Sequence, residues 1–266
     1  MSDPDVQPMP EDVAVALARA AGRLGPFAHE VRWYSDVPST NDIAATWAEC
    51  GAIEGSVVVA DTQSAGRGRQ GRCWASPVGA GLYVSTVLRP IEQVLPFLTI
   101  AAGLGLTEGI QAATGLVAEL KWPNDVFMSG RKVAGVLAEA TSSPAGTCVV
   151  LGFGINVSIA AYPPEVADLA TSLEEQHGEP VARGRVLAEC LSAFACRYLD
   201  LAEGRRGAVL EAWRGRASSM VGRRVRWSEM GGHREGVVDG IDDAGALVVR
   251  TGDGPTRITA GELQWL

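Results

Sequence analysis

Residues 62–74 read TQSAGRGRQGRCW and lie between two apolar runs, Ser56–Asp61 and Leu82–Leu88. The valine-rich runs are typical of strands, so this part of the chain is predicted to be strand, long loop, strand. Three glycines let the loop backbone approach a ligand closely, and three arginines supply planar guanidinium groups suited to phosphate or carboxylate. An anion-binding loop on a sheet is therefore predicted, and a solvated surface loop is the alternative.

The three glycines, Gly66, Gly68 and Gly71, also match the G-x-G-x-x-G pattern of dinucleotide-binding folds. In those folds the pattern opens a helix, whereas residues 73–79 have no helical period and lead into a strand. No Lys-Ser or Lys-Thr pair follows the glycines, which excludes a P-loop as well. Trp74 ends the stretch with a flat ring on which an aromatic base can stack.

The composition predicts a globular, soluble protein. The chain has 266 residues, of which 47% are hydrophobic, enough for one large domain or a domain with a small appendage. We expect no membrane partner, because no apolar run reaches the roughly 18 residues of a membrane helix. The acidic start lacks the basic region of a signal peptide, which favours the cytoplasm. The net charge of -8 argues against a nucleic-acid partner.

Cysteine and histidine give no sign of a metal centre. The five cysteines contain no C-x-x-C pair and sit mostly in apolar segments, so they are predicted to be reduced thiols in the core. The three histidines are scattered and form no metal-binding pair or Ser-His-Asp set.

The first 50 residues predict two helices around one strand. Residues 11–24 form an amphipathic pattern that ends at Gly25-Pro26, and the first strand follows at 31–34, which leaves no room for a DNA-reading helix-turn-helix. Ser39 and Asp42 have the spacing of a capping box before a helix that ends at Gly51. Capping explains these residues, although their hydroxyls and free amides are also able to hold a small polar ligand.

The middle of the chain adds a core helix over 94–113 and a second motif over 119–139. This motif reads as a strand, a Pro-Asn-Asp bend and a hairpin that turns at Ser129-Gly130. It places a carboxylate, an amide and two lysines together, which are the groups needed to hold magnesium and neutralise phosphate. The alternative is that the Pro-Asn-Asp bend is only a turn and Lys132 only a charge on an edge strand. A strand over 148–157 carries glycines that permit close ligand approach, and Asn156 offers an amide for a purine edge. A long helix is predicted over 184–201.

The composition changes after residue 217, where four short alternating runs are separated by glycine turns at 231–232, 242–245 and 252–254. A small antiparallel barrel is predicted there, docked on the main domain because about 50 residues fold poorly alone. The predicted domains are residues 1–217 and 218–266.

These motifs together resemble those of the biotin protein ligases. The resemblance covers nearly the whole chain after about residue 30 and rests on five segments: Ser39–Asn41, Gln63 to Trp74, Lys121–Asp125, Gly130–Gly135 and Gly152–Asn156. It implies an α+β fold, with a central mixed β-sheet flanked by helices and a C-terminal SH3-like β-barrel. It also implies the monofunctional type, without the N-terminal DNA-binding domain of the repressor members.

The resemblance implies a role for each matching residue. Lys132, Arg69 and Asp125 would be catalytic, and Asp125 would also lie by the metal. Biotin would contact Ser39, Thr40, Asn41, Gln63, Arg67, Gly68, Arg69 and Lys132. The nucleotide would contact Arg69, Arg72, Trp74, Asn124, Lys132 and Asn156.

The reaction implied is ATP-dependent activation of biotin to biotinyl-5'-AMP, followed by transfer to a lysine of a biotin carboxyl carrier domain of an acyl-CoA carboxylase. ATP and Mg²⁺ would be required. A lipoate or other acyl ligase of related fold is the nearest alternative, and the Arg-Gly loop favours biotin over it. A DNA-binding repressor or a non-catalytic SH3-like interaction protein is the alternative from another class.

Overall fold

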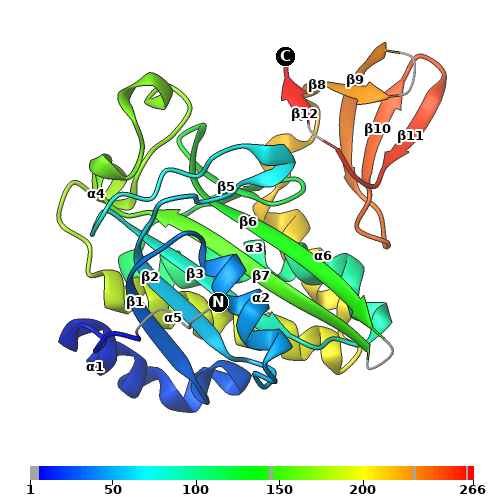
Figure 1. Cartoon of the computed structure of the whole chain (residues 1–266). Helices are drawn as coiled ribbons and strands as arrows, with labels where there is room; N and C mark the ends of the chain where they lie inside the picture. The colour runs from blue at the N-terminus through cyan, green and yellow to red at the C-terminus, as the bar shows by residue number, and fades with distance from the viewer. Residues whose placement is uncertain (1–5, 144–145, 230–231, 262) are drawn as a thin grey trace.

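The computed structural model describes residues 6–143, 146–229, 232–261 and 263–266. A large sheet with helices on both faces forms most of the molecule, and a smaller sheet at the C-terminus stands beside it (Figure 1). This is the predicted α+β architecture.

The large sheet has seven strands in the order β1-β2-β3-β7-β6-β5-β4. Only β1 and β2 are parallel, and the other neighbours are antiparallel, so the sheet is mixed as predicted. The bounds are β1 Val31–Val37, β2 Val57–Gln63, β3 Gly81–Leu88, β4 Glu119–Lys121, β5 Asp125–Met128, β6 Arg131–Ser143 and β7 Gly146–Asn156. The turn between β5 and β6 has positive φ at Ser129 and Gly130, which confirms the predicted hairpin.

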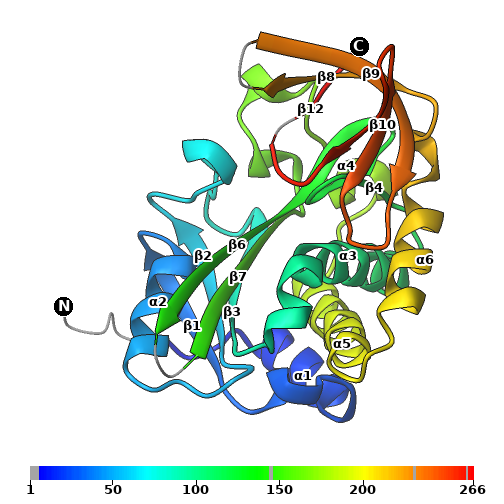
Figure 2. The same cartoon turned by 90° about the vertical axis from the view of Figure 1, so that its right-hand side faces the viewer.

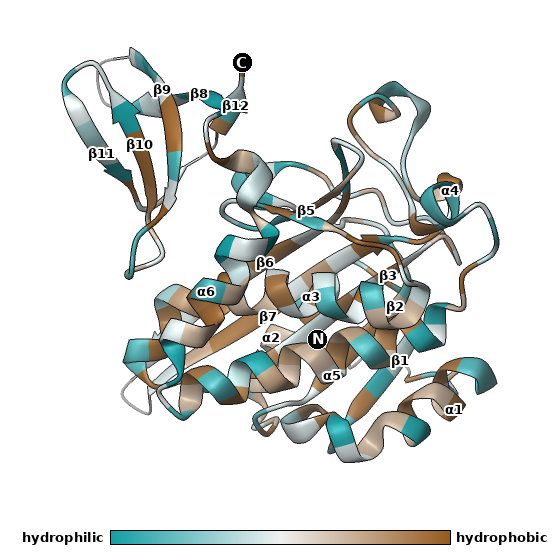
Figure 3. Cartoon of the chain, turned by 180° about the vertical axis from the view of Figure 1, so that it is seen from behind, coloured by the Kyte–Doolittle hydropathy of each residue, from teal (hydrophilic) through white to brown (hydrophobic). Residues whose placement is uncertain are grey.

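The two faces of the sheet are covered unequally. Seen from behind, α1 (Glu11–Ala20), α3 (Leu98–Thr114), α5 (Arg183–Ala202) and α6 (Arg206–Arg216) lie in front of the sheet with their apolar sides inward (Figure 3). The opposite face carries α2 (Thr40–Glu49), which packs on β2, β3 and β7 over a separate core cluster. The one-turn helix α4 (Leu173–His177) lies at the edge of the molecule in Figure 1, and in Figure 2, turned by 90°, it lies behind the strands of the large sheet.

Helices α3 and α5 are in unusually close contact. A Cβ at Gly105 would lie 2.6 Å from the Phe194 Cα, and a Cβ at Gly109 would clash with the Cys190 backbone. The two glycines therefore let the backbones of α3 and α5 touch, which fixes α5 against α3.

Helix α3 begins four residues later than the sequence predicts. Residues Glu92–Phe97 form a 3-10 turn that contains Pro96, and the α-helix starts at Leu98, because a proline lacks the N–H that an α-helical turn requires. The expectation that no segment reaches membrane-spanning length is also wrong. Glu92–Thr114 is long and apolar enough to cross a membrane, since an 18-residue stretch within it has a mean hydropathy of 1.3, but 72% of that stretch is buried inside the fold.

The cysteines only partly follow the prediction. All five are free, but only Cys190 is buried; Cys148 is half-buried and Cys50, Cys73 and Cys196 are exposed. Cys50 and Cys196 lie in helical segments whose apolar residues face the core, but these two cysteines lie on the solvent side. An apolar surrounding sequence therefore did not predict whether the cysteine itself is buried.

The C-terminal sheet has five antiparallel strands in the order β11-β10-β9-β8-β12. They are β8 Arg224–Glu229, β9 Gly232–Ile241, β10 Leu247–Thr251, β11 Gly254–Ile258 and β12 Leu263–Trp265. The sequence did not predict β12, and part of the predicted turn at 231–232 lies outside the described residues. The boundary between residues 217 and 218 stays a prediction.

Several hydrogen bonds tie this sheet to the main body, among them one from Arg214 of α6 to the carbonyl of Ile241 in β9 (3.1 Å). Trp122 Nε1 donates to the carbonyl of Gly245 (3.0 Å), and Arg69 donates to the carbonyl of Gly261 (3.3 Å). Trp122 is buried, so its indole N–H has no solvent to replace this partner. The small sheet is thereby held next to the bend that joins β4 to β5.

We predict that Gly109→Ala lowers the free energy of unfolding by about 1–3 kcal/mol, because the added methyl forces α3 and α5 apart. Gly207→Ala in α6 is the matched control: an added Cβ there meets nothing within 4 Å, so the variant should be neutral or stabilised by up to about 1 kcal/mol. Urea unfolding of both variants measures the difference. Equal stability of the two would contradict close α3–α5 packing.

Candidate active site

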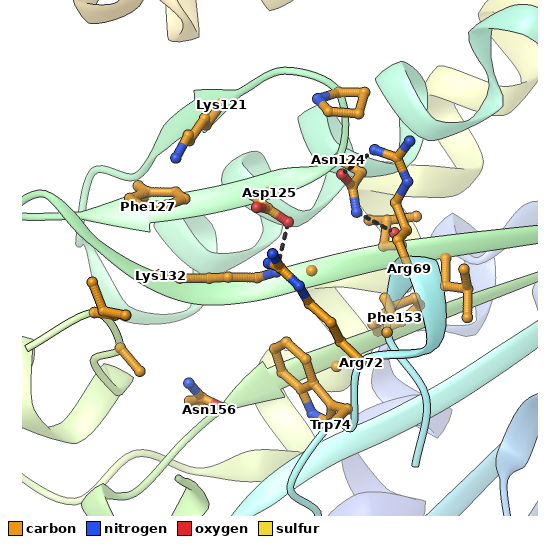
Figure 4. Close-up of a pocket in the computed structure, with 18 of the residues that line it drawn as sticks. Arg69, Arg72, Trp74, Lys121, Asn124, Asp125, Phe127, Lys132, Phe153 and Asn156 are labelled. Carbon is orange, nitrogen blue, oxygen red and sulfur yellow. Dashed lines mark hydrogen bonds and ion pairs between the residues drawn. The ribbon is translucent and has the colours of Figure 1, made fainter. Parts of the chain in front are cut away.

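A cavity of about 730 Å³ lies between the glycine-arginine loop, the β5–β6 hairpin and the C-terminal sheet. Its wall includes every residue that the sequence analysis assigned to biotin, nucleotide or metal: Ser39, Thr40, Asn41, Gln63, Arg67, Gly68, Arg69, Arg72, Trp74, Asn124, Asp125, Lys132 and Asn156. Residues from distant parts of the chain thus share one cavity. Figure 4 shows Asp125, Lys132 and Arg72 converging in its middle, with Trp74 to one side.

The floor of the cavity is a row of residues across four strands. Lys121 pairs with Asp125, Asp125 with Gly135, and Gly135 with Gly154, so their side chains share one face of the sheet. The Trp74 ring lies directly on the two glycines, since a Cβ at Gly154 would come within 2.5 Å of it. The sequence analysis expected the glycines of β7 to admit a ligand, and the structure shows that Gly154 admits Trp74.

Lys132 and Asp125 face each other in the middle of the cavity. Lys132 Nζ is 2.7 Å from Asp125 Oδ1 and 5.3 Å from the centre of the Trp74 ring. Both side chains are partly exposed to the cavity, so an incoming anion is able to reach the ammonium group. The lysine is thus placed to serve an anionic ligand rather than the core.

The Pro-Asn-Asp bend anchors the loop. Asn124 is buried; its Nδ2 donates to the Val136 carbonyl (2.7 Å) and its Oδ1 accepts from Arg69 (3.0 Å). Because Arg69 also reaches Gly261, one guanidinium joins the loop, the bend and the C-terminal sheet. The amide of Asn124 is committed to these contacts within the protein.

The end of the cavity near α2 is polar but contains a closed hydrogen-bond network. Gln63 Oε1 accepts from the Thr40 backbone N–H (2.8 Å) and faces the Thr40 hydroxyl (3.2 Å). The Ser85 hydroxyl lies 2.8 Å from Thr40 Oγ1 and 2.6 Å from Asn41 Oδ1. The side chain of Ser39 forms no capping hydrogen bond, so the predicted capping box is wrong.

Two carboxylates hold Arg67, which the sequence analysis did not predict. Arg67 bonds to Asp42 (2.6 Å) and to Glu139 (2.9 Å), and Glu139 also accepts from Asn41 (2.6 Å). The hydrogen bond to Asp42 and then that to Glu139 raise the pKa of Arg67, despite its partial burial. Arg67 therefore has two partners within the protein before any anionic ligand binds.

Residues after β7 close the third side of the cavity and were missed by the sequence analysis. The backbone of Lys132 pairs with this segment through Leu169 (2.8 Å) and Thr171 (2.9 Å). Asn156 Nδ2 donates to the Thr171 carbonyl (3.0 Å), which leaves its Oδ1 as the acceptor for a ligand. Tyr162 and Leu169 also line the cavity.

Glu175 fixes this segment against the hairpin. It accepts a hydrogen bond from Tyr162 (2.6 Å) and pairs with Arg131, the neighbour of Lys132 (2.6 Å). The Tyr162 hydrogen bond and then Arg131 hold the pKa of Glu175 below its usual range, and burial together with Glu175 raises the pKa of Tyr162 to about 12. Both groups therefore keep their charge state near neutral pH.

The described residues of the cavity supply few ligands for a metal ion bound by the protein alone. Among the described residues, no three His, Cys, Asp or Glu side chains gather to hold one. Asp125 supplies one carboxylate in the middle of the cavity, which suits Mg²⁺ that is carried mainly by nucleotide phosphates and water.

Two family models match the chain: the Biotin/lipoate A/B protein ligase family over residues 34–156, and the Biotin protein ligase C terminal domain over residues 221–264. The chain is 35% identical over 237 residues to the Biotin--[acetyl-CoA-carboxylase] ligase of Mycobacterium tuberculosis, with 85% of each chain covered. The chain belongs to the biotin protein ligase family. It is also 36% identical to the Bifunctional ligase/repressor BirA of Bacillus subtilis, of which it covers 73%.

A solved structure supports the assignment. The biotin protein ligase from Aquifex aeolicus in complex with biotin and ATP is 31% identical, with a TM-score of 0.79 over 90% of this chain and 99% of that chain. The agreement extends through the C-terminal domain, since nearly all of the Aquifex chain is covered.

We predict that Glu139→Gln speeds tryptic cleavage within residues 65–74 of the ligand-free protein by up to about fivefold, because a partly exposed ion pair contributes at most about 1 kcal/mol to loop closure. Glu179→Gln, at an exposed position where the structure records no ion pair among the described residues, is the control and should leave the rate unchanged. Identical cleavage of Glu139→Gln and the parent would mean that Glu139 does not hold the loop.

Proposed function

We propose that this protein activates biotin with ATP to biotinyl-5'-AMP and transfers biotin to a lysine of a biotin carboxyl carrier domain. The observation that carries the proposal is the division of one cavity into a neutral hydrogen-bonding end near α2 and a cationic end around Lys132. Biotin has the same division, with an uncharged ring system at one end and a carboxylate at the other. Family membership supports the same reading.

The ring of biotin would lie at the neutral end, against Thr40, Asn41 and Gln63. Arg67 does not attract an anion there, because its positive charge is paired with the carboxylates of Asp42 and Glu139. We therefore assign the side chain of Arg67 to holding the loop, and leave ring contacts to the loop backbone at Arg67 and Gly68. The carboxylate would then extend toward Lys132.

At the cationic end, Lys132, Arg69 and Arg72 would oppose the repulsion between the biotin carboxylate and the ATP phosphates. The carboxylate oxygen attacks the α-phosphorus, a new O–P bond forms, and pyrophosphate leaves with the electron pair of the broken bond. This step needs positioned positive charge rather than a protein nucleophile. The lack of a catalytic triad in the sequence is consistent with it.

The purine of ATP would stack on Trp74 and donate its amino hydrogen to Asn156 Oδ1, the acceptor that the Thr171 contact leaves open. Asn124 would act through Arg69, whose guanidinium it holds. We propose that Mg²⁺ enters with ATP beside Asp125 and neutralises phosphate charge when bound.

The acceptor lysine would enter from solvent and attack the carbonyl carbon of the adenylate, with AMP as the leaving group. It must lose a proton first, and Asp125 is our candidate acceptor for it. A reducing compartment such as the cytoplasm suits the free cysteines of the chain, three of which are exposed.

Lipoate ligation is the competing activity, because the first family model covers biotin and lipoate ligases alike. Pyrophosphate exchange into ATP, measured with biotin, lipoate and octanoate in turn, separates them. Exchange with biotin alone supports our proposal. Exchange with lipoate or octanoate in preference to biotin would replace it, and no exchange with any acid would exclude adenylation.

We predict that Lys132→Ala reduces biotin-dependent pyrophosphate exchange by about a hundredfold or more, because the cation nearest the reacting anions is removed. The fold should persist, since Lys132 is partly exposed and contributes no apolar packing to the core. Arg250→Ala in the C-terminal sheet is the control for loss of one positive charge and should retain full exchange. Undiminished exchange in Lys132→Ala would remove this lysine from the reaction.

A further inference from the structure

A buried serine lies beneath the neutral end of the cavity. Ser85, in β3, is fully buried, and its hydroxyl oxygen lies 2.8 Å from Thr40 Oγ1 and 2.6 Å from Asn41 Oδ1. Ser85 pairs with Gly152 across the sheet, and a Cβ at Gly152 would come within 2.1 Å of Asn41 Oδ1. The glycine therefore leaves the space in which Asn41 reaches Ser85. Because Ser85 is fully buried, it influences a ligand through these two neighbours.

The chemistry of the groups fixes where the hydrogens of this network lie. A carboxylate only accepts, so the 2.6 Å contact between Asn41 and Glu139 requires the Asn41 NH₂ group to face Glu139, and Asn41 Oδ1 then faces Ser85. That oxygen carries no hydrogen, so the single hydrogen of the Ser85 hydroxyl lies on the bond to Asn41. The hydroxyl oxygens of Thr40 and Ser85, 2.8 Å apart, also need a hydrogen between them, and the Thr40 hydroxyl supplies it. Thr40 Oγ1 is thereby left with lone pairs alone for a ligand.

Gln63 presents a second acceptor beside Thr40. Its Nε2 donates to Ser76 Oγ (2.9 Å), which fixes Oε1 as the atom that accepts from the Thr40 backbone N–H (2.8 Å). Gln63 Oε1 and Thr40 Oγ1 are 3.2 Å apart, and both are acceptors because the Thr40 hydrogen points to Ser85, the nearer oxygen. Both residues line the cavity. Two acceptor oxygens side by side favour a ligand that brings an N–H donor.

We propose that Ser85 and Glu139 determine specificity for acids whose ring carries N–H groups, because they fix the direction of the hydrogen bonds that end at Thr40. Glu139 acts at one end of this chain of hydrogen bonds and Ser85 in its middle, so both are positioning residues. The inference rests on the proposed function, in which the cyclic urea of biotin lies at this end of the cavity. An acid without N–H groups, such as octanoate, would leave both acceptor oxygens without a partner, which a buried site disfavours.

Removal of the Ser85 hydroxyl tests this polarity. In Ser85→Ala the Thr40 hydrogen would turn to Gln63 Oε1 and occupy the space between the two acceptors. We expect the Kd for biotin, measured by calorimetry, to rise about tenfold, because roughly one hydrogen bond to the ligand is lost. The Kd for octanoate should not rise, because octanoate has no N–H group. The Kd for ATP should stay unchanged, because the residues proposed to bind ATP lie at the other end of the cavity.

Ser85→Cys provides a second variant in case Ser85→Ala does not fold. It keeps a side chain of similar size with a weaker donor, so the Kd for biotin should rise in the same direction by a smaller factor.

Thr86→Val is the matched control. Thr86 is the next residue of β3, is equally buried, and donates its hydroxyl hydrogen to the Leu151 carbonyl (3.3 Å). Successive side chains of a strand point to opposite faces, so this variant also loses a buried hydroxyl but should keep the parent Kd for biotin.

An unchanged Kd for biotin in whichever Ser85 variant folds would overturn the proposal. An equal rise in the Kd values for biotin and octanoate would also overturn it, and would assign Ser85 to packing alone. Failure of the parent to bind biotin would reject both the proposal and the function on which it rests. Because binding is measured without turnover, absence of pyrophosphate exchange would reject adenylation alone, and the Ser85 comparison would still decide the polarity of the network.

Discussion

The contact between the Trp74 ring and two glycines of the sheet is the constraint on which the cavity depends. Strand register places Gly135 and Gly154 side by side, and together they leave a flat area on which an indole ring is able to lie. Since Trp74 ends the glycine-arginine loop, its position there brings Arg69 over the Pro-Asn-Asp bend. A side chain at Gly154 would lift the ring and with it the wall of the cavity.

This contact lowers the entropic cost that a ligand must offset to order the loop. A loop rich in glycine is entropically costly to order, and the sequence alone suggests that ligand must supply the compensating contacts. The structure provides contacts from the protein as well: Arg67 is held by two carboxylates and Arg69 by an amide and a carbonyl. The ligand therefore has less ordering cost to offset, because part of the loop is fixed before it binds.

The sequence predicted the residues of the cavity better than their interactions. The strand-loop-strand arrangement and the hairpin at Ser129-Gly130 follow from local patterns, which are properties of neighbouring residues. The pairing of Arg67 with Glu139 joins positions 72 residues apart, and no local pattern encodes it. Strand β12 has only three residues, too few for a periodic signal, so the place of Trp265 beside Lys121 was also missed.

The C-terminal sheet contacts both the Pro-Asn-Asp bend and the glycine-arginine loop. It is held by Trp122, in the bend that carries Asn124, and by Arg69, in the loop that carries Trp74. A movement of the loop that breaks the Arg69 contact would release one of the hydrogen bonds that hold the sheet against the cavity. Because Gly261 accepts from the same guanidinium that Asn124 holds, loop closure and docking of the C-terminal sheet favour each other. The small domain is thus a part of the cavity wall that the loop contacts directly through Arg69.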